Sequence, residues 1–135
     1  MGGYTRVSWP ELEGIGFGTS RVYSGPLGCR QLAFVINRQP PGVSAQYHAH
    51  QVADEIYVLF SGRGILEVEG DVIELAPFEA VRISHGLAHV NRNPSPDTEA
   101  VWLVIGTPID EYAGEEPHLY GPAAGLPEVR PKPRA

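Results

Sequence analysis

The chain of 135 residues has the length of one domain and can enclose one continuous core. Its formal net charge is −6, and its ten Lys and Arg residues form no basic stripe, so we expect no nucleic-acid partner. The single cysteine, Cys29, excludes an intrachain disulfide. No signal-peptide pattern opens the chain, and no apolar stretch approaches the roughly 20 residues of a membrane span. These features predict a cytoplasmic protein with no membrane partner.

Short strands are the elements that the sequence predicts. Its 16 glycines and 13 prolines suit strands joined by tight turns, and no window holds a helical period over ten or more residues. The Gly-rich start allows one short strand within 15–22. Runs of β-branched and aromatic residues then predict strands over 30–37, 45–50, 55–60, 64–69, 72–75, 80–83, 88–92 and 99–105. This spacing is typical of an all-β sandwich or barrel.

Three segments follow from this pattern. Residues 1–27 form a Gly-rich N-terminal segment, which could be an added or exchanged strand, and residues 28–108 form the barrel. Residues 109–135 form a Pro-rich tail, which we expect to be partly ordered against the barrel. The apolar wall and core are expected from Phe34, Ile36, Phe60, Val81, Ile83, Trp102 and Val104.

Three histidines and one glutamate stand out by their spacing. His48 and His50 are two positions apart, so on a strand both side chains point to one face. Glu55 opens the next predicted strand, and a hairpin between the two strands would bring its carboxylate beside both imidazoles. His89 comes from a much later strand. Together they form an N₃O ligand set that suits one divalent transition metal per chain: Mn, Fe, Co, Ni, Cu or Zn.

Strand parity adds further candidates for the same pocket. Gln46 falls on the face of the two nearer histidines and Tyr57 on the face of the glutamate, so both are candidates to contact a bound ligand or to act in catalysis. Packing explains Tyr57 equally well. Asn91 is a similar candidate beside the third histidine, whereas for Asn93 a role in securing the following turn is favoured.

His85 lies in the predicted turn before His89. Imidazole titrates near neutrality, so a catalytic role as a proton carrier is open, although a rim or turn position without chemistry is favoured. The remaining histidine, His118, lies in the Pro-rich tail and is assigned no role.

The spacing of these residues resembles the two sequence motifs of the cupin family. The first motif has no position missing: Gly42, five residues, His48-Ala49-His50, four residues, Glu55, six residues, Gly62. The second motif resembles Gly70, Pro77, Glu79, His89, three residues, Asn93. It departs from the family pattern at two places in the connecting turn. One extra residue lies between Gly70 and Pro77, and Glu79 stands where glycine is common.

This resemblance covers about residues 30–105 and implies a jelly-roll barrel of two antiparallel sheets with a metal ion in its mouth. It implies that His48, His50, Glu55 and His89 are the metal ligands. A homodimer is also implied, because small cupins commonly pair sheets or exchange N-terminal strands.

The function expected on this basis is metal-dependent chemistry on a small oxygen-rich organic molecule. Four protein ligands leave two positions on an octahedral ion, where two adjacent substrate oxygens could chelate. A dioxygenase is favoured, with isomerase, decarboxylase or lyase chemistry through an enolate as other options. Two alternatives stay open: a non-catalytic metal-bearing module that binds or senses a small molecule, and a purely structural barrel. Neither the metal nor the substrate is named by the sequence.

Overall fold

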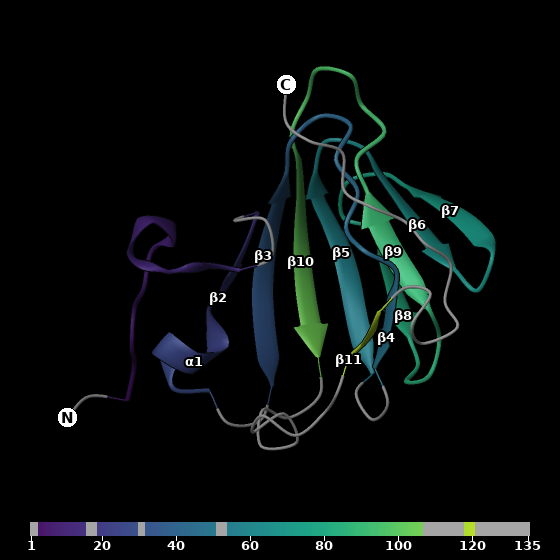
Figure 1. Ribbon diagram of the computed structural model, residues 1–135. Helices are drawn as coiled ribbons and strands as arrows, with labels where there is room; N and C mark the ends of the chain where they lie inside the picture. Colours follow the sequence, from purple (N-terminus) through teal and green to yellow (C-terminus); the bar gives the residue numbers. More distant parts are fainter. Residues whose placement is uncertain (1–2, 16–18, 30–31, 51–53, 107–117, 121–135) are drawn as a thin grey trace.

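The computed structural model describes residues 3–15, 19–29, 32–50, 54–106 and 118–120. The described strands form two antiparallel sheets (Figure 1). The six-stranded sheet has the order β1-β2-β3-β10-β5-β8, with β1 at Gly14–Ile15, β2 at Ser20–Val22, β3 at Ala33–Gln39, β10 at Ala100–Gly106, β5 at Glu55–Ser61 and β8 at Ala80–Ile83. The five-stranded sheet has the order β11-β4-β9-β6-β7, with β11 at His118–Tyr120, β4 at His48–His50, β9 at His89–Arg92, β6 at Gly64–Val68 and β7 at Asp71–Leu75.

The predicted all-β jelly-roll class is confirmed, and each strand predicted between residues 30 and 105 has a counterpart. Helix is limited to two short pieces among the described residues, a 3-10 turn at Trp9–Glu11 and α1 at Ser24–Leu27. The sequence did not predict α1, which ends at Leu27 and is capped by Gly28, a residue with a φ of 80°. In the part of the chain that the structure describes, no helix is long and apolar enough to cross a membrane.

The two ends of the chain add strands to the two sheets. The strand expected within 15–22 is divided into β1 and β2, and β2 pairs with β3 of the same chain. In the tail, β11 pairs with β4, so residues 118–120 lie against the five-stranded sheet. The other residues beyond 106 lie outside the described part of the chain.

The core lies between the sheets and centres on Trp102, which is completely buried on β10. The other buried members of this cluster are Tyr57, Leu59, Leu66, Leu75, Ile83 and Ala100, with Val81 and Val104 packed against them. The prediction is wrong for three core residues, which point away from the core: Phe34, Ile36 and Phe60. Side chains alternate along a strand, and Asn37 and Leu59 point inward, so the even-numbered positions of β3 and β5 point outward.

Two turns explain features of the motifs. Gly62, between β5 and β6, has a φ of 83°, and a Cβ atom there would collide with the backbone oxygen of Glu99. Glu79 stands where glycine is common, and its Oε1 accepts a hydrogen bond from the backbone N–H of Ala76 at 2.7 Å. The Glu79 side chain thus stabilises the longer turn before β8.

Candidate metal centre

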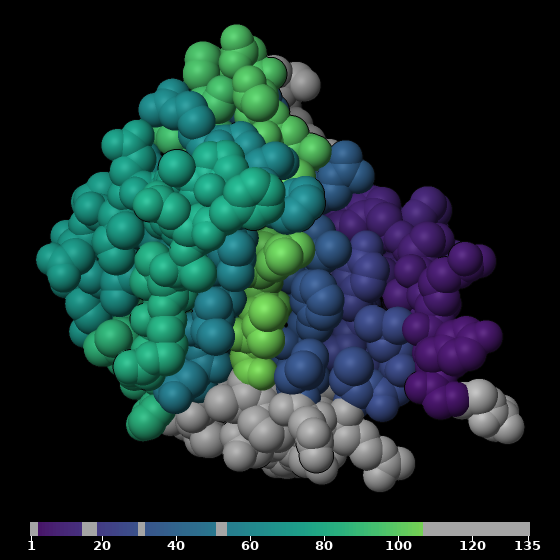
Figure 2. Space-filling model, turned by 180° about the vertical axis from the view of Figure 1, so that it is seen from behind, coloured from purple at the N-terminus to yellow at the C-terminus, as the bar shows by residue number. Residues whose placement is uncertain are grey.

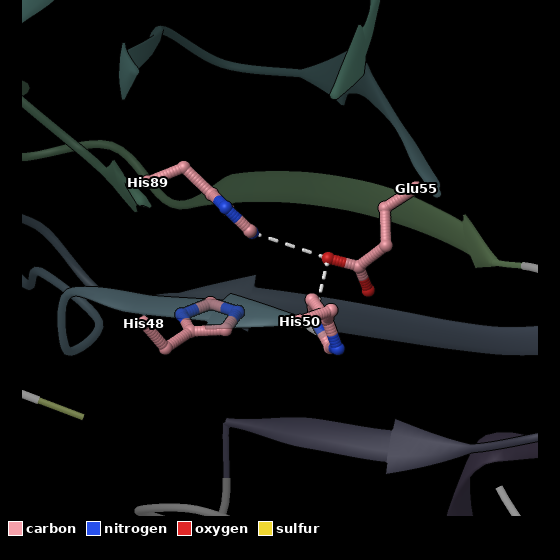
Figure 3. Close-up of side chains that lie close together, drawn as sticks. All are labelled: His48, His50, Glu55 and His89. Atoms are coloured by element: carbon pink, nitrogen blue, oxygen red, sulfur yellow. Dashed lines mark hydrogen bonds and ion pairs between the residues drawn. The ribbon is translucent and has the colours of Figure 1, made fainter. Parts of the chain in front are cut away.

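Four side chains converge inside the barrel: His48, His50, Glu55 and His89 (Figure 3). Each offers one ligand atom, and these atoms all lie within 4.8 Å of one another. His48 and His50 share a face of β4, as their spacing predicts. His89 lies directly opposite His48 on the neighbouring strand β9, and their ring centroids are 4.3 Å apart. The four predicted side chains are therefore brought together.

The strands of His50 and Glu55 do not pair as a hairpin, which was one way to bring Glu55 beside the imidazoles. β4 lies in the five-stranded sheet, whereas β5 pairs with β10 and β8 in the six-stranded sheet. Glu55 is the first residue of β5 and its side chain reaches the histidines from the opposite sheet (Figure 3). The residues between the two strands, 51–53, lie outside the described part of the chain. The packing of the two sheets, rather than a local turn, therefore brings Glu55 to the histidines.

Backbone carbonyl groups orient two of the imidazoles. The Nδ1 atom of His48 lies 3.0 Å from the oxygen of Gln46, and the Nδ1 atom of His89 lies 2.8 Å from the oxygen of Leu87. A carbonyl oxygen can only accept, so each Nδ1 carries the hydrogen. In a neutral imidazole the lone pair is then on Nε2, and hydrogen bonds of this kind orient metal-binding histidines.

The Glu55 carboxylate is placed between two of these rings. Its Oε1 atom lies 2.8 Å from Nε2 of His50 and 3.2 Å from Nε2 of His89, and only 12% of the Glu55 side chain is exposed. With the hydrogen of His89 on Nδ1, its Nε2 and the carboxylate oxygen face each other as two acceptors unless a proton or a cation lies between them. A divalent ion would supply this positive charge to all four side chains, so the donor set fits a metal.

Burial and neighbouring charges keep two of these groups ready to bind a metal. Burial, reinforced by nearby His89, lowers the pKa of His48 to about 4, so this imidazole is neutral at pH 7. Burial acts to raise the pKa of Glu55, but the imidazoles of His50 and His89 at hydrogen-bonding distance from its carboxylate outweigh this effect and hold the pKa well below its ordinary value. A neutral imidazole and an ionised carboxylate are the forms that bind metal ions.

Tyr57 and Gln46 contribute in different ways. Tyr57 is buried on β5, with its ring edge-on to His89 at a centroid distance of 5.5 Å and edge-on to Trp102 at 6.1 Å. It therefore joins the centre to the core. Gln46 precedes β4 and is exposed. The alternation of side chains along β4 does not apply to Gln46, because this residue lies outside the strand. Gln46 contributes its backbone oxygen, which orients His48.

His85 lies on the rim, in the turn between β8 and β9, and is 61% exposed. Its backbone N–H donates to Oδ1 of Asp54 at 2.8 Å, and its Nδ1 atom lies 3.2 Å from the same oxygen. These hydrogen bonds from His85 lower the pKa of Asp54. The sequence did not predict a role for Asp54. This residue precedes Glu55, so its hydrogen bonds with His85 connect the turn before β9 to the start of β5.

Sequence reasoning also missed a network of buried side chains beside the centre. Gln39 accepts a hydrogen bond from Nε1 of Trp102 at 2.8 Å and donates from Nε2 to the backbone oxygen of Asn91 at 3.0 Å. Nδ2 of Asn91 donates to Oδ1 of Asn37 at 3.1 Å. Asn91 thus links β9, the strand of His89, to the opposite sheet. Asn37 and Gln39, two positions apart on β3, would have indicated this network, but the predicted strand ends at residue 37.

Asn93 secures the turn after β9, which is the role that the sequence favours. Its Nδ2 atom donates to the backbone oxygens of Gln39, Pro40 and Thr98. Its Oδ1 atom accepts from the backbone N–H of Ser95 at 2.9 Å. These bonds hold the end of β9 against the end of β3.

Comparisons with known proteins agree with this architecture. Residues 35–106 match the family model described as Cupin domain, and no curated protein matches the chain. A cupin protein from Bacteroides fragilis has a TM-score of 0.66 at 22% identity, covering 96% of this chain and 100% of its own. A conserved protein with a double-stranded β-helix domain from Klebsiella pneumoniae has a TM-score of 0.66 at 17% identity, covering 87% and 97%. A mutant salicylate 1,2-dioxygenase from Pseudoaminobacter salicylatoxidans has a TM-score of 0.68 at 14% identity, covering 82% and 32%.

Proposed function

The chain belongs to the cupin family, and on that premise we propose that it is a metal-dependent enzyme acting on a small oxygen-rich organic molecule, with dioxygenation the favoured reaction. The observation that carries this proposal is the convergence of His48, His50, Glu55 and His89 within 4.8 Å. Four protein ligands leave two positions on an octahedral ion for a chelating substrate.

Two of the four side chains that would hold the ion are already oriented by the backbone. The carbonyl oxygens of Gln46 and Leu87 already turn Nε2 of His48 and of His89 toward the centre. Glu55 supplies one negative charge, so a divalent ion would retain a net positive charge. A bound ion would supply Lewis acidity to a chelated oxygen and, if redox-active, a means of engaging O₂. Tyr57 packs against His89 and keeps water from that side of the ring.

The distribution of charge supports a substrate that is apolar apart from its chelating oxygens. The described strands carry four arginines, and all four stand on outward faces: Arg21, Arg38, Arg82 and Arg92. Inward positions of β5, β8 and β10 near the centre are apolar, as at Tyr57, Val81 and Val104. No arginine lies on an inward face of the described strands, so an anionic substrate oxygen would be bound there by the ion. Catechols, β-diketones, flavonols and hydroxyaryl carboxylates have this character.

Dioxygenation is favoured among the reactions open to such a site because an apolar, buried surrounding suits O₂ and an aromatic ring. The similarity in fold to a protein named as a salicylate 1,2-dioxygenase agrees with this choice. The partner proposed for this chain is therefore a small aromatic or diketone molecule.

Oxygen consumption tests the proposal. The protein is stripped of metal, reconstituted separately with Fe, Mn, Ni and Cu, and offered the four substrate classes in an oxygen electrode with product analysis. We expect turnover with at least one metal and one class, and loss of turnover in His89→Ala. His85→Ala is the matched control, since it removes a histidine from the rim, and we expect turnover to persist in it. A molecule that binds tightly to the reconstituted protein and is recovered unchanged would favour the binding or sensing module instead.

A further inference from the structure

Two amide side chains meet inside the barrel next to the metal centre. Asn91 lies two positions after His89 on β9, so both side chains point to the same inward face and their Cα atoms are about 7 Å apart. Asn37 reaches Asn91 from β3 in the opposite sheet. We call Asn37 and Asn91 the inner amide pair. β2 extends the six-stranded sheet beyond β3, where Figure 2 shows the purple N-terminal segment beside the blue residues of that strand.

Contacts with β2 fix the orientation of both amides. Nδ2 of Asn37 donates to Oγ of Ser20 at 2.8 Å and lies 3.2 Å from the backbone oxygen of Thr19. A backbone oxygen can only accept, so the nitrogen of Asn37 faces β2 and its Oδ1 faces Asn91. Nδ2 of Asn91 donates to that Oδ1 at 3.1 Å. The Oδ1 atom of Asn91 therefore lies on the side of its carboxamide that points away from Asn37.

This Oδ1 atom is an unused acceptor. The backbone oxygen of Asn91 accepts from Nε2 of Gln39 and from the backbone N–H of Ala45, both at 3.0 Å. Its side-chain oxygen accepts no hydrogen bond from any residue in the described part of the chain, although only 4% of Asn91 is exposed. Buried polar groups are almost always hydrogen-bonded, so this oxygen needs a donor that water or a ligand supplies.

The interior beside the inner amide pair is open to small molecules. Val68, Val81 and Val104 face inward and pack against the core, yet they are only partly buried. Val35, opposite Val104 on β3, is also half-buried. Inward positions of a barrel that is filled by its own side chains are buried. The half-buried valines therefore border space that a substrate bound at the metal centre can enter.

We propose that the inner amide pair recognises the substrate through a hydroxyl group that donates a hydrogen bond to Oδ1 of Asn91. This inference rests on the proposed function and narrows it to catechols, flavonols and related chelators that bear a hydroxyl group in addition to their chelating oxygens. Asn91 contacts this hydroxyl group. Asn37 is a positioning residue, because it acts by turning the oxygen of Asn91 toward the substrate.

The chemistry of the free atom selects a neutral donor. An amide oxygen can only accept, so a carboxylate at the same position of the substrate would oppose it acceptor to acceptor. A hydroxyl group donates without bringing a charge into the barrel interior. A site that holds an acceptor ready for a hydroxyl group also discriminates against an analogue that lacks it, because the buried acceptor is then left unpaired.

Three hydroxypyranones test this recognition in the full-length chain loaded with zinc, which has no redox chemistry. Allomaltol, kojic acid and comenic acid chelate metals through the same two adjacent oxygens and differ in one ring substituent, which is a methyl, a hydroxymethyl and a carboxylate group, respectively. Calorimetric titration measures each affinity, which is divided by the affinity of the same probe for free zinc. Kojic acid is expected to bind about tenfold more tightly than allomaltol on this scale, and comenic acid no more tightly than allomaltol.

Two variants separate recognition from structural support. Asn91→Leu removes the free oxygen, and the preference for kojic acid should fall to within about twofold. Asn37→Ser removes the partner that orients Asn91 and should reduce the preference in part. Allomaltol is the internal control, since its affinity should change by less than about twofold in both variants. The wild-type comparison stays decisive if neither variant folds, which circular dichroism checks.

The outcomes distinguish this inference from the proposed function. Equal affinities of the wild type for kojic acid and allomaltol on the normalised scale would overturn recognition by the inner amide pair and leave the metal chemistry standing. Tighter binding of comenic acid, or a preference that survives Asn91→Leu, would overturn it in the same way. A zinc-loaded chain that binds none of the three probes would overturn both.

Discussion

The Nε2 atom of His89 lies 3.2 Å from Oε1 of Glu55, although the two residues are 34 positions apart and belong to opposite sheets. The hydrogen bond from Nδ1 of His89 to Leu87 leaves this Nε2 with its lone pair in the neutral ring. A carboxylate and an imidazole lone pair in direct apposition are stabilised by a cation between them. This single relationship links the fold to the proposed metal chemistry.

Replacing the carboxylate tests that relationship. Glu55→Gln keeps the shape of the side chain but removes its charge, so we expect the affinity for a divalent ion to fall about tenfold or more. Competition with a chromophoric chelator measures this affinity. Glu74→Gln, at a highly exposed residue on β7, is the matched control and should leave the affinity unchanged. Equal affinities in Glu55→Gln and the wild type would mean that Glu55 is not a ligand.

The buried amide of Gln39 should matter for stability. Gln39→Leu leaves Nε1 of Trp102 without its acceptor in the core and is expected to lower the free energy of unfolding by about 1–3 kcal/mol. Urea denaturation measures the change. Arg38→Gln, which breaks an exposed ion pair with Glu99, is expected to cost less than about 1 kcal/mol. If Arg38→Gln proved the more damaging change, the network would not brace the core as described.

Two glycines with similar backbone angles should respond differently to alanine. Gly62 has a φ of 83° and Gly70 a φ of 89°, so each substitution introduces left-handed strain of about 1 kcal/mol. At Gly62 the new Cβ atom also collides with the oxygen of Glu99, whereas at Gly70 it meets no atom within 4 Å. Thermal or urea unfolding should therefore show a clearly larger loss for Gly62→Ala. Equal losses of stability would show that the turn after β5 shifts to accommodate the new Cβ atom at little cost.

The metal-free protein should lose stability on mild acidification through His48. Burial, reinforced by His89, lowers the pKa of His48 from 6.5 in the free residue to about 4. Between these values the unfolded chain binds a proton that the folded chain does not, so stability falls as the pH drops from about 6.5 to about 4. Glu55 stays ionised in the folded chain because its pKa is held below the ordinary 4.5, so it adds to the loss only at the acid end of this window, where the unfolded chain begins to protonate it.

Unfolding in urea at pH 7 and pH 5 measures this effect in the wild type and in His48→Gln. The wild type should lose about 2 kcal/mol more than the variant between the two pH values. Identical losses would show that His48 titrates normally in the folded protein.

The sequence predicted the strands well because turn-forming residues separate them so clearly. Pro40 and Gly42 follow β3, and Gly62 and Gly70 mark the turns after β5 and β6. It also predicted the ligand set, since the spacing of His48 and His50 has a direct meaning on a strand. The pairing partners of each strand were harder to predict from the sequence. A hairpin between the strands of His50 and Glu55 is one possible pairing, but β4 and β5 lie in different sheets.

The outward-facing residues show a second limit. Because apolar side chains normally point inward, the sequence predicts Phe34, Ile36 and Phe60 in the core. On β5 both faces are apolar, so the alternation that would tell inside from outside is lost over Ile56 to Phe60. The carbonyl groups of Gln46 and Leu87 were beyond prediction for another reason: every residue carries one, and only the fold selects which of them orients an imidazole.

The metal content of the purified chain tests the central claim most directly. Wild type and a His48→Ala/His89→Ala double variant are stripped, reconstituted side by side with Mn, Fe, Ni and Zn, desalted and analysed by mass spectrometry. The account predicts about one transition-metal ion per chain in the wild type, since the four residues form one N₃O set, and almost none in the variant. A wild type that stays metal-free after every reconstitution, or a variant that retains as much metal as the wild type, would contradict it.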